Sequence, residues 1–205
     1  MLRHKNGLSP GRCEVDLQIS ARPERFLYRV WRILQTGFLG RPTPTAWAPL
    51  PGMNPWESPG IARRIGWLVH SHRLWTGRDL MSAADESSLA ERVWAAPFVV
   101  VSHGTEADPV LWYGNRTALG LWQMDWAEFT STPSRFTAEA PEREERARLM
   151  AAVTARGFID DYAGVRISRN GRRFRIHRAT VWNVVDSEGR PAGQAASFAE
   201  WEWLD

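Results

Sequence analysis

The chain has 205 residues, of which 43% are apolar and 24% are charged, an ordinary globular composition with enough length for one well-buried core. Its longest apolar run, residues 93–101, has about half of the roughly 20 residues that a membrane helix needs, which excludes a membrane-spanning helix. Cys13 is the single cysteine, which excludes an internal disulfide and a clustered-cysteine metal site. Because the N-terminal region also lacks the apolar stretch of a secretory signal, we expect a cytoplasmic protein.

The net charge of +3 is unevenly distributed. Residues 1–52 carry seven arginines and one lysine against three acidic residues, a net charge of +5, which leaves −2 for the rest of the chain. Because only this tail is basic, we expect no nucleic-acid binding by the folded body. Frequent proline and glycine predict that residues 1–57 form a poorly ordered extension, although RFLYRVWRIL within it would suit a basic helix that binds a membrane surface or a partner. Met53 offers an alternative start of the native protein.

Two helices are predicted after this extension. From Ser58 to Gly77, apolar residues recur at spacings of three and four, the pattern of a helix with one buried stripe. A second helix begins at Ser87 or Ser88, whose hydroxyl suits the N-cap position, and ends before Pro97.

The next segment, residues 97–156, predicts a hairpin followed by helices. The β-branched run 97–104 and the short strand 110–113 flank a polar turn and form the hairpin. Asn115 suits the N-cap of the short helix that follows. A longer helix runs from Pro141 to Arg156, and its acidic start and basic end suit the helix dipole.

Three strands are predicted at the end of the chain, in residues 157–168, 172–185 and 190–201, joined by Gly-containing turns. Alternation along the middle strand predicts one apolar face and one polar face. The apolar face would hold Phe174, Ile176, Thr180, Trp182 and Val184, and the polar face Arg173, Arg175, His177 and Asn183. Arg178 is predicted on the apolar face. The order of elements lacks a βαβ crossover pattern and predicts an α+β fold with a five-stranded antiparallel sheet and flanking short helices.

The chain resembles MEKHLA domains, which themselves resemble PAS domains. The resemblance is carried by PFVVVSHGTEADPVLWYGNRTALGLWQMDWAEFTSTPSR (97–135) and GFIDDYAGVRISRNGRRFRIHRATVWNVVDSEGRPAGQAASFAEW (157–201). It implies a PAS-like domain in residues 97–205, preceded by an N-terminal helical cap in residues 58–96. It also implies a small, free-standing bacterial sensory module that binds a small molecule or a signalling protein and pairs as a homodimer. The chain shows no kinase, cyclase or DNA-binding region, so we expect its output to pass through another molecule.

The segment SHGTEAD holds the densest cluster of reactive side chains. Ser102, His103, Glu106 and Asp108 would supply a nucleophile, a base and two carboxylates for hydrolysis or proton transfer. The competing interpretation is a tight turn whose side chains bond to the local backbone, because Asp before proline commonly starts a turn.

Aromatic and polar residues of the strands suggest a ligand pocket. The chain has twelve tryptophans, and those in the PAS-like part would line a pocket for a flat ligand or simply fill the core. Arg178 and Gln194 are candidate anchors, since a charge on an apolar face needs a partner. Glu106, Asp108 or Asp161 would alternatively pair with Arg178. The full set of candidate ligand-binding residues is His103, Glu106, Asp108, Asn115, Trp122, Arg178, Trp182 and Gln194.

No motif indicates a metal or a common PAS cofactor. His70 and His72 point about 200° apart around their helix and cannot share an ion from one face. In haem-binding members of the PAS class that the chain resembles, the iron ligand is often a histidine on the helix that precedes the last three strands, and the predicted helix 141–156 contains no histidine. Photoactive flavin chemistry in such domains needs a cysteine in the body of the domain, and the sequence has none there. The leading interpretation is a non-catalytic sensor. The alternatives are a small enzyme or cofactor-binding protein using His103, Glu106 and Arg178, and an interaction subunit whose cavity is filled by side chains.

Overall fold

The computed structural model describes residues 53–82, 87–138 and 143–204, all within the second of the two units into which the chain divides, residues 38–205. Most of the predicted extension, including RFLYRVWRIL, lies outside the described residues. The helical elements are η2 (Pro55–Glu57), α2 (Pro59–Thr76), α3 (Leu89–Ala95), α4 (Arg116–Trp122), α5 (Trp126–Phe129), η3 (Ser134–Thr137) and α6 (Arg143–Arg156). The strands are β1 (Val99–His103), β2 (Leu111–Gly114), β3 (Phe158–Ile167), β4 (Arg173–Val185), β5 (Pro191–Phe198) and β6 (Glu200–Leu204).

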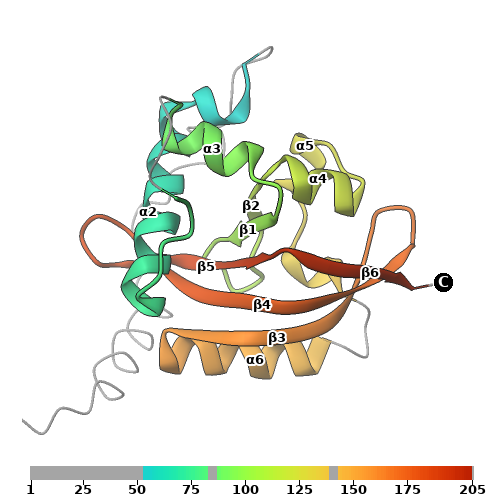
Figure 1. The fold of residues 1–205 in the computed structure, drawn as a ribbon. Helices are drawn as coiled ribbons and strands as arrows, with labels where there is room; N and C mark the ends of the chain where they lie inside the picture. Colours follow the sequence, from blue (N-terminus) through green and yellow to red (C-terminus); the bar gives the residue numbers. More distant parts are fainter. Residues whose placement is uncertain (1–52, 83–86, 139–142, 205) are drawn as a thin grey trace, which may run out of the picture. The chain divides into compact units, whose positions relative to one another are not determined.

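Five strands form an antiparallel sheet in the order β2-β1-β5-β4-β3, which confirms the predicted fold class. The sixth strand, β6, was not expected. The predicted strand 190–201 breaks at Ala199, so that β5 pairs with the second half of β4 and β6 pairs with the first half. In Figure 1, β6 accordingly continues the line of β5 along one edge of β4.

Local signals place the helices as predicted. Pro59 opens α2, and Gly77 ends it with a left-handed φ of 70°. The Ser88 side chain accepts a hydrogen bond from the Glu91 backbone N–H and caps α3. The side chain of Asn115 accepts in the same way from the N–H of Ala118 at the start of α4.

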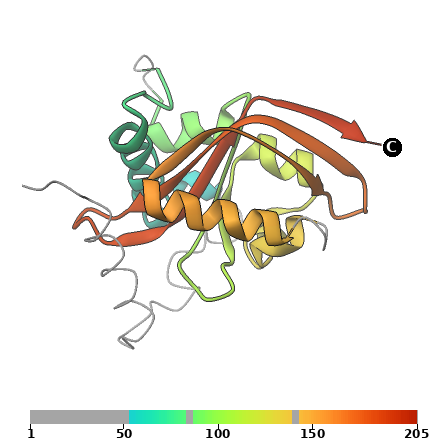
Figure 2. The ribbon, with the colours of Figure 1, turned by 90° about the horizontal axis from the view of Figure 1, so that it is seen from below.

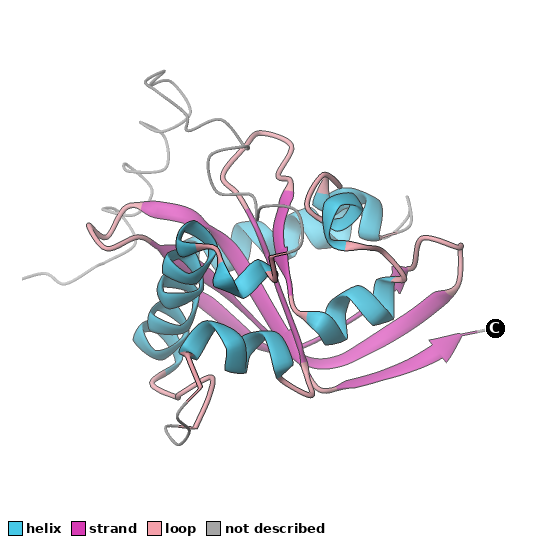
Figure 3. Ribbon diagram, turned by 90° about the horizontal axis from the view of Figure 1, so that it is seen from above, coloured by secondary structure: helices cyan, strands magenta, loops and turns pink. Residues whose placement is uncertain are grey.

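Each face of the sheet packs against its own set of helices and has its own core. On one face, α2 and α3 bury residues such as Ile65, Leu68 and Trp182. On the other face, α4 and α5 pack Trp122 and Phe129 against β4 and β5. Figure 2 shows α6 running along β3, and Figure 3 shows the strands with the helices that flank them.

The predicted faces of β4 are wrong from Arg178 onward, because a bulge in β4, matched by one in β3, reverses the alternation. Asp161 in β3 and Arg178 in β4 have positive φ values of 61° and 48°, and the register between the two strands shifts beside them. The bulges place Ala179 opposite Tyr162. An extra residue in a strand moves every later side chain to the other face. Phe174 and Ile176 therefore belong to one core, whereas Trp182 and Val184 belong to the other.

Arg178 does not lie on an apolar face, contrary to the sequence prediction. Its side chain is 69% exposed and forms an ion pair with Glu200. This partner differs from the three acidic residues that the sequence suggested. The bulge that turns Arg178 outward also explains why an arginine stands among apolar residues at this point in the sequence.

Candidate functional site

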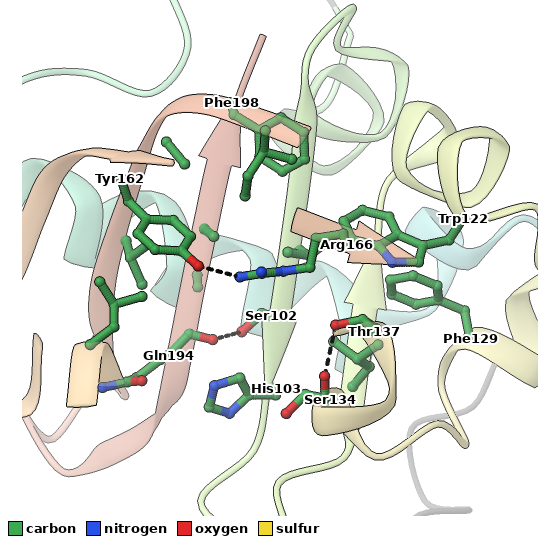
Figure 4. Close-up of a pocket in the computed structure, with 18 residues that line it drawn as sticks. Ser102, His103, Trp122, Phe129, Ser134, Thr137, Tyr162, Arg166, Gln194 and Phe198 are labelled. Carbon is green, nitrogen blue, oxygen red and sulfur yellow. Dashed lines mark hydrogen bonds between the residues drawn. The ribbon is translucent and has the colours of Figure 1, made fainter. Parts of the chain in front are cut away.

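A cavity of about 80 Å³ lies between the sheet and the helices on the α4 face. Most of its walls are aliphatic or aromatic. The lining residues are Val101, Ser102, His103, Leu111, Trp122, Phe129, Ser134, Thr137, Leu149, Tyr162, Arg166, Ile176, Ala179, Val181, Gln194, Ala195, Ala196 and Phe198. Figure 4 shows the Arg166 side chain extending across this space toward the hydroxyl of Tyr162.

Arg166 is the buried charge of the cavity. It comes from β3 and is only 7% exposed. One guanidinium nitrogen donates to the backbone carbonyl of Val165 at 2.8 Å, and another donates to the Tyr162 hydroxyl at 3.0 Å. The guanidinium carbon also lies 5.4 Å from the centre of the Tyr162 ring, within the range of a cation–π contact.

Gly164 makes room for this pair. The residue lies between Tyr162 and Arg166 in β3, opposite Ile176. A Cβ atom there would stand 2.3 Å from the Tyr162 hydroxyl and 3.2 Å from an Arg166 guanidinium nitrogen. Glycine at this position therefore lets two large polar side chains occupy the same stretch of the sheet face.

Trp122 supplies a second buried donor. It ends α4, is 3% exposed, and packs edge-on against Phe129, Phe174 and Phe198. Its indole N–H is buried and has no hydrogen-bond partner in the part of the chain that the structure describes. An unsatisfied buried donor is uncommon in folded proteins. Among the described residues, the indole N–H groups of Trp75 and Trp112, which do not line the cavity, are buried without a partner as well.

The polar groups at the β1–β5 side of the cavity are bonded to the protein. The Ser102 hydroxyl donates to the carbonyl of Gln194 at 2.9 Å, and the Gln194 side chain donates to Asn183 and Thr154. His103 Nδ1 lies 2.8 Å from the carbonyl oxygen of Gly104. These bonds join β1, β4, β5 and α6 at the end of the cavity.

Three of the eight sequence-predicted candidates line the cavity: His103, Trp122 and Gln194. Asn115 does not, because its fully buried side chain caps α4 and also bonds to the backbone of Val100 and Phe98. Trp182 lies on the opposite face of the sheet, where its indole N–H donates to the Leu68 carbonyl of α2 at 3.1 Å.

Glu106 and Asp108 stand outside the cavity. Asp108 pairs with Arg135 at 2.9 Å. Glu106 folds back over Gly104, where a Cβ atom would lie 2.2 Å from the carboxylate. Burial lowers the pKa of Arg64 to about 10, against the opposing attraction of Glu106. The structure brings His103 to the cavity but does not bring Glu106 or Arg178 to it.

Sequence reasoning missed Arg166 and Tyr162. The sequence contains a pattern that indicates this pair. Tyr162, Gly164 and Arg166 occupy every second position of β3, so their side chains share one face of the strand. The sequence of β4 alternates more regularly than that of β3, so it drew the prediction of site residues to Arg178. Within the described residues, no three His, Cys, Asp or Glu side chains gather as a metal-ligand set.

The fold and the cavity together define a class of protein. It is an α+β domain with an antiparallel sheet, helices on both faces of that sheet, and a small, partly open cavity lined in part by a buried arginine. A family model, the MEKHLA domain, matches residues 62–203, and the chain therefore belongs to the MEKHLA domain family.

Among the described helices, none has the length and apolar character needed to cross a membrane.

Two plant proteins are among the relatives. Homeobox-leucine zipper protein ATHB-14 of Arabidopsis thaliana is 27% identical over 168 residues, which are 77% of this chain and 20% of that protein. Homeobox-leucine zipper protein HOX32 of Oryza sativa subsp. japonica is 23% identical over 154 residues, or 74% of this chain and 18% of that protein. The chain thus spans about a fifth of the length of these relatives.

Solved structures of PAS and related domains are similar at low sequence identity. The PAS domain of a protein from Colwellia psychrerythraea aligns with a TM-score of 0.48 and 10% identity, over 56% of this chain and 92% of that one. The light-state dimer of the fungal blue-light photoreceptor Vivid aligns with a TM-score of 0.48 and 15% identity, over 76% of this chain and 99% of that one.

Proposed function

We propose that this MEKHLA domain is a non-catalytic sensor that binds a small molecule in the cavity between the sheet and α4. The observation that carries the proposal is that two buried donors, the guanidinium of Arg166 and the indole N–H of Trp122, belong to residues that line this cavity. A core that served packing alone would bury apolar atoms at these positions at lower cost. Polar groups that converge on a cavity with apolar walls are typical of a ligand site.

The size of the cavity limits the ligand. Pockets for drug-sized ligands and cofactors have volumes of about 300–1,000 Å³, whereas this cavity has about 80 Å³. The proposed ligand is accordingly much smaller than a flavin or a haem. Arg178 stands outside the cavity, so the catalytic set of His103, Glu106 and Arg178 is not part of this proposal.

Ligand release tests the proposal directly. The protein would be purified from its own host without small organic acids or alcohols in the buffers, then denatured, and the filtrate analysed by mass spectrometry. We expect a small molecule in near-stoichiometric amount, which rebinds to the refolded protein. If neither the native protein nor the refolded protein retains any small molecule under these conditions, the sensory proposal is wrong.

The output of the sensor is part of the same proposal. The Trp182 side chain donates a hydrogen bond to Leu68 of α2, and the adjacent Val181 lines the cavity. One stretch of β4 therefore contacts both α2 and the cavity. Occupancy of the cavity would therefore be passed to α2 and read by a protein partner or by a second copy of the chain. Light scattering coupled to size-exclusion chromatography, with and without the released molecule, would show whether association of copies depends on the ligand.

A further inference from the structure

The charge of Arg166 is not balanced by the described residues. A guanidinium carries five N–H donors, and the structure accounts for hydrogen bonds to Val165 and Tyr162, both to neutral oxygens. None of the ion pairs formed among residues 53–82, 87–138 and 143–204 includes Arg166. A charge that is 93% removed from solvent is costly unless an opposite charge comes to it.

The same cavity contains a second, independent donor with no acceptor. The indole N–H of Trp122 comes from α4, on the helical side of the cavity, whereas Arg166 comes from the sheet. Both groups donate and neither can accept a hydrogen bond. A ligand group that bonds to both of these donors must be an acceptor, and the charge of Arg166 favours an anionic one.

The other walls define the remainder of the ligand. Aliphatic and aromatic side chains such as Val101, Ile176 and Phe198 make up most of the lining. A volume of about 80 Å³ is well below the roughly 300–1,000 Å³ of pockets for drug-sized ligands, so the ligand is a small molecule. A fully charged inorganic anion would leave these apolar walls without a matching group.

We infer that the cavity binds a short-chain monocarboxylate, with its carboxylate on Arg166 and Trp122 and its alkyl group against the apolar walls. This inference rests on the proposed function, because it names the chemical class of the ligand for the same site. Arginine is suited to the role, since its planar fork matches the two oxygens of a carboxylate. Tyr162 holds the guanidinium in place through its hydroxyl and its ring.

Titration of the unmodified protein is the primary experiment. Calorimetry and thermal unfolding would be measured with sodium acetate, propionate and butyrate, and with propionamide, sodium nitrate and sodium chloride at equal ionic strength. We expect one of the carboxylates to bind at least tenfold more tightly than propionamide, since a charged hydrogen-bond pair is lost in the amide. Nitrate binding as tightly as the best carboxylate would overturn the assignment to a carboxylate.

Two variants locate the binding. Arg166→Gln is expected to weaken carboxylate binding roughly 10- to 100-fold. Arg172→Gln is the matched control, because Arg172 also stacks on an aromatic ring, that of Trp203 at 4.1 Å, but is exposed. In the unmodified protein, the ¹⁵N–¹H signal of the Trp122 indole should shift on binding. An unmoved Trp122 signal, or equal loss in both variants, contradicts the proposed site.

The outcomes separate this inference from the proposed function. If propionamide binds as well as propionate, the anionic ligand is wrong, while a sensor for a neutral ligand stands. Release of no small molecule by the native protein, together with no binding of any probe, rejects both proposals.

Discussion

Asn115 shows how one polar residue can fix several elements at once. Its side chain accepts from the N–H groups of Ala118 and Val100 and donates to the carbonyls of Val93 and Phe98. The residue is fully buried, so water cannot replace these bonds. The sequence predicted the cap, because Asn before a short apolar helix is a local signal. The bonds to β1 and α3 depend on tertiary packing, which no local pattern reveals.

Replacing Asn115 by alanine therefore tests more than a helix cap. We expect Asn115→Ala to lower the free energy of unfolding by about 2–4 kcal/mol, because buried donors and acceptors lose their partners. Asp125 is the matched control, since it caps α5 through the Glu128 N–H from an exposed position. Asp125→Ala should cost only about 1 kcal/mol. Denaturant unfolding measures both, and equal losses would show that Asn115 acts as a cap alone.

At the scale of elements, the paired bulges of β3 and β4 decide which side chains meet. Without them, Thr180, Trp182 and Val184 would continue the face of Phe174 and Ile176, as the alternation predicted. With them, Ala179 and Val181 line the cavity, and Trp182 contacts α2 on the opposite face. The sequence gives no clear signal here, because the bulge positions are occupied by aspartate and arginine rather than glycine. The sequence thus predicted that β4 is a strand, but it did not predict which face each side chain after the bulge occupies.

The backbone of Arg178 provides a test of the bulge. A β-branched residue is strongly disfavoured at its φ of 48°, so Arg178→Val should lower the free energy of unfolding by about 1–3 kcal/mol. Arg178→Gly should be nearly neutral, because relief of the left-handed strain offsets loss of an exposed ion pair with Glu200. Arg175→Val, at an exposed position in regular β4, is the control and should not destabilise. Equal effects of valine at both positions would reject the bulge as the cause.

The contact between α2 and β4 makes stability depend on pH. Burial lowers the pKa of His72 below its ordinary value of 6.5, against the raising effect of its hydrogen bond to the Arg78 carbonyl. Its ring also packs edge-on against Trp182 at 4.9 Å. Arg78 further lowers this pKa, while the charges of Asp79 and Asp160 raise it.

The sign follows from proton binding. Because the pKa of His72 is lower in the folded protein than in the unfolded chain, the unfolded chain binds the proton first as the pH falls. The free energy of unfolding therefore decreases as the pH drops below about 6.5, and this loss is absent well above pH 6.5. His72→Gln should flatten this part of the pH profile. His70→Gln, at an exposed position on the same helix, should leave it unchanged. Denaturant unfolding at several pH values decides, and an unaltered slope in His72→Gln contradicts the assignment.

For the molecule as a whole, two cores share one sheet, and the features that the sequence predicted are the local ones. Helix starts, helix ends and hairpin turns were predictable because Ser88, Asn115 and Gly77 act through their neighbours. The cavity was not, because it depends on which strand faces oppose which helices. Arg166 became visible as a site residue only when the register of β3 against β4 was known.

Residues 1–52 are expected to contribute little to the stability of the folded domain. The chain divides after residue 37 into two units, and the basic tail of the sequence ends before Met53. The cores on the two faces of the sheet, with the partly buried residues packed against them, are built from residues between Trp56 and Trp203. We therefore expect a chain that begins at Met53 to unfold within about 2 °C of the full chain, which corresponds to less than about 1 kcal/mol.

Differential scanning calorimetry of both chains, at matched concentration and salt, measures this shift. Carboxylate titration of the shortened chain adds a second readout, because the cavity lining comes entirely from residues 101–198. Its affinity should equal that of the full chain. A chain starting at residue 38 is the control for removal of the first unit alone. If the chain from Met53 unfolds many degrees lower while the chain from residue 38 does not, residues 38–52 belong to the folded domain, and the domain boundary expected near residue 57 is wrong.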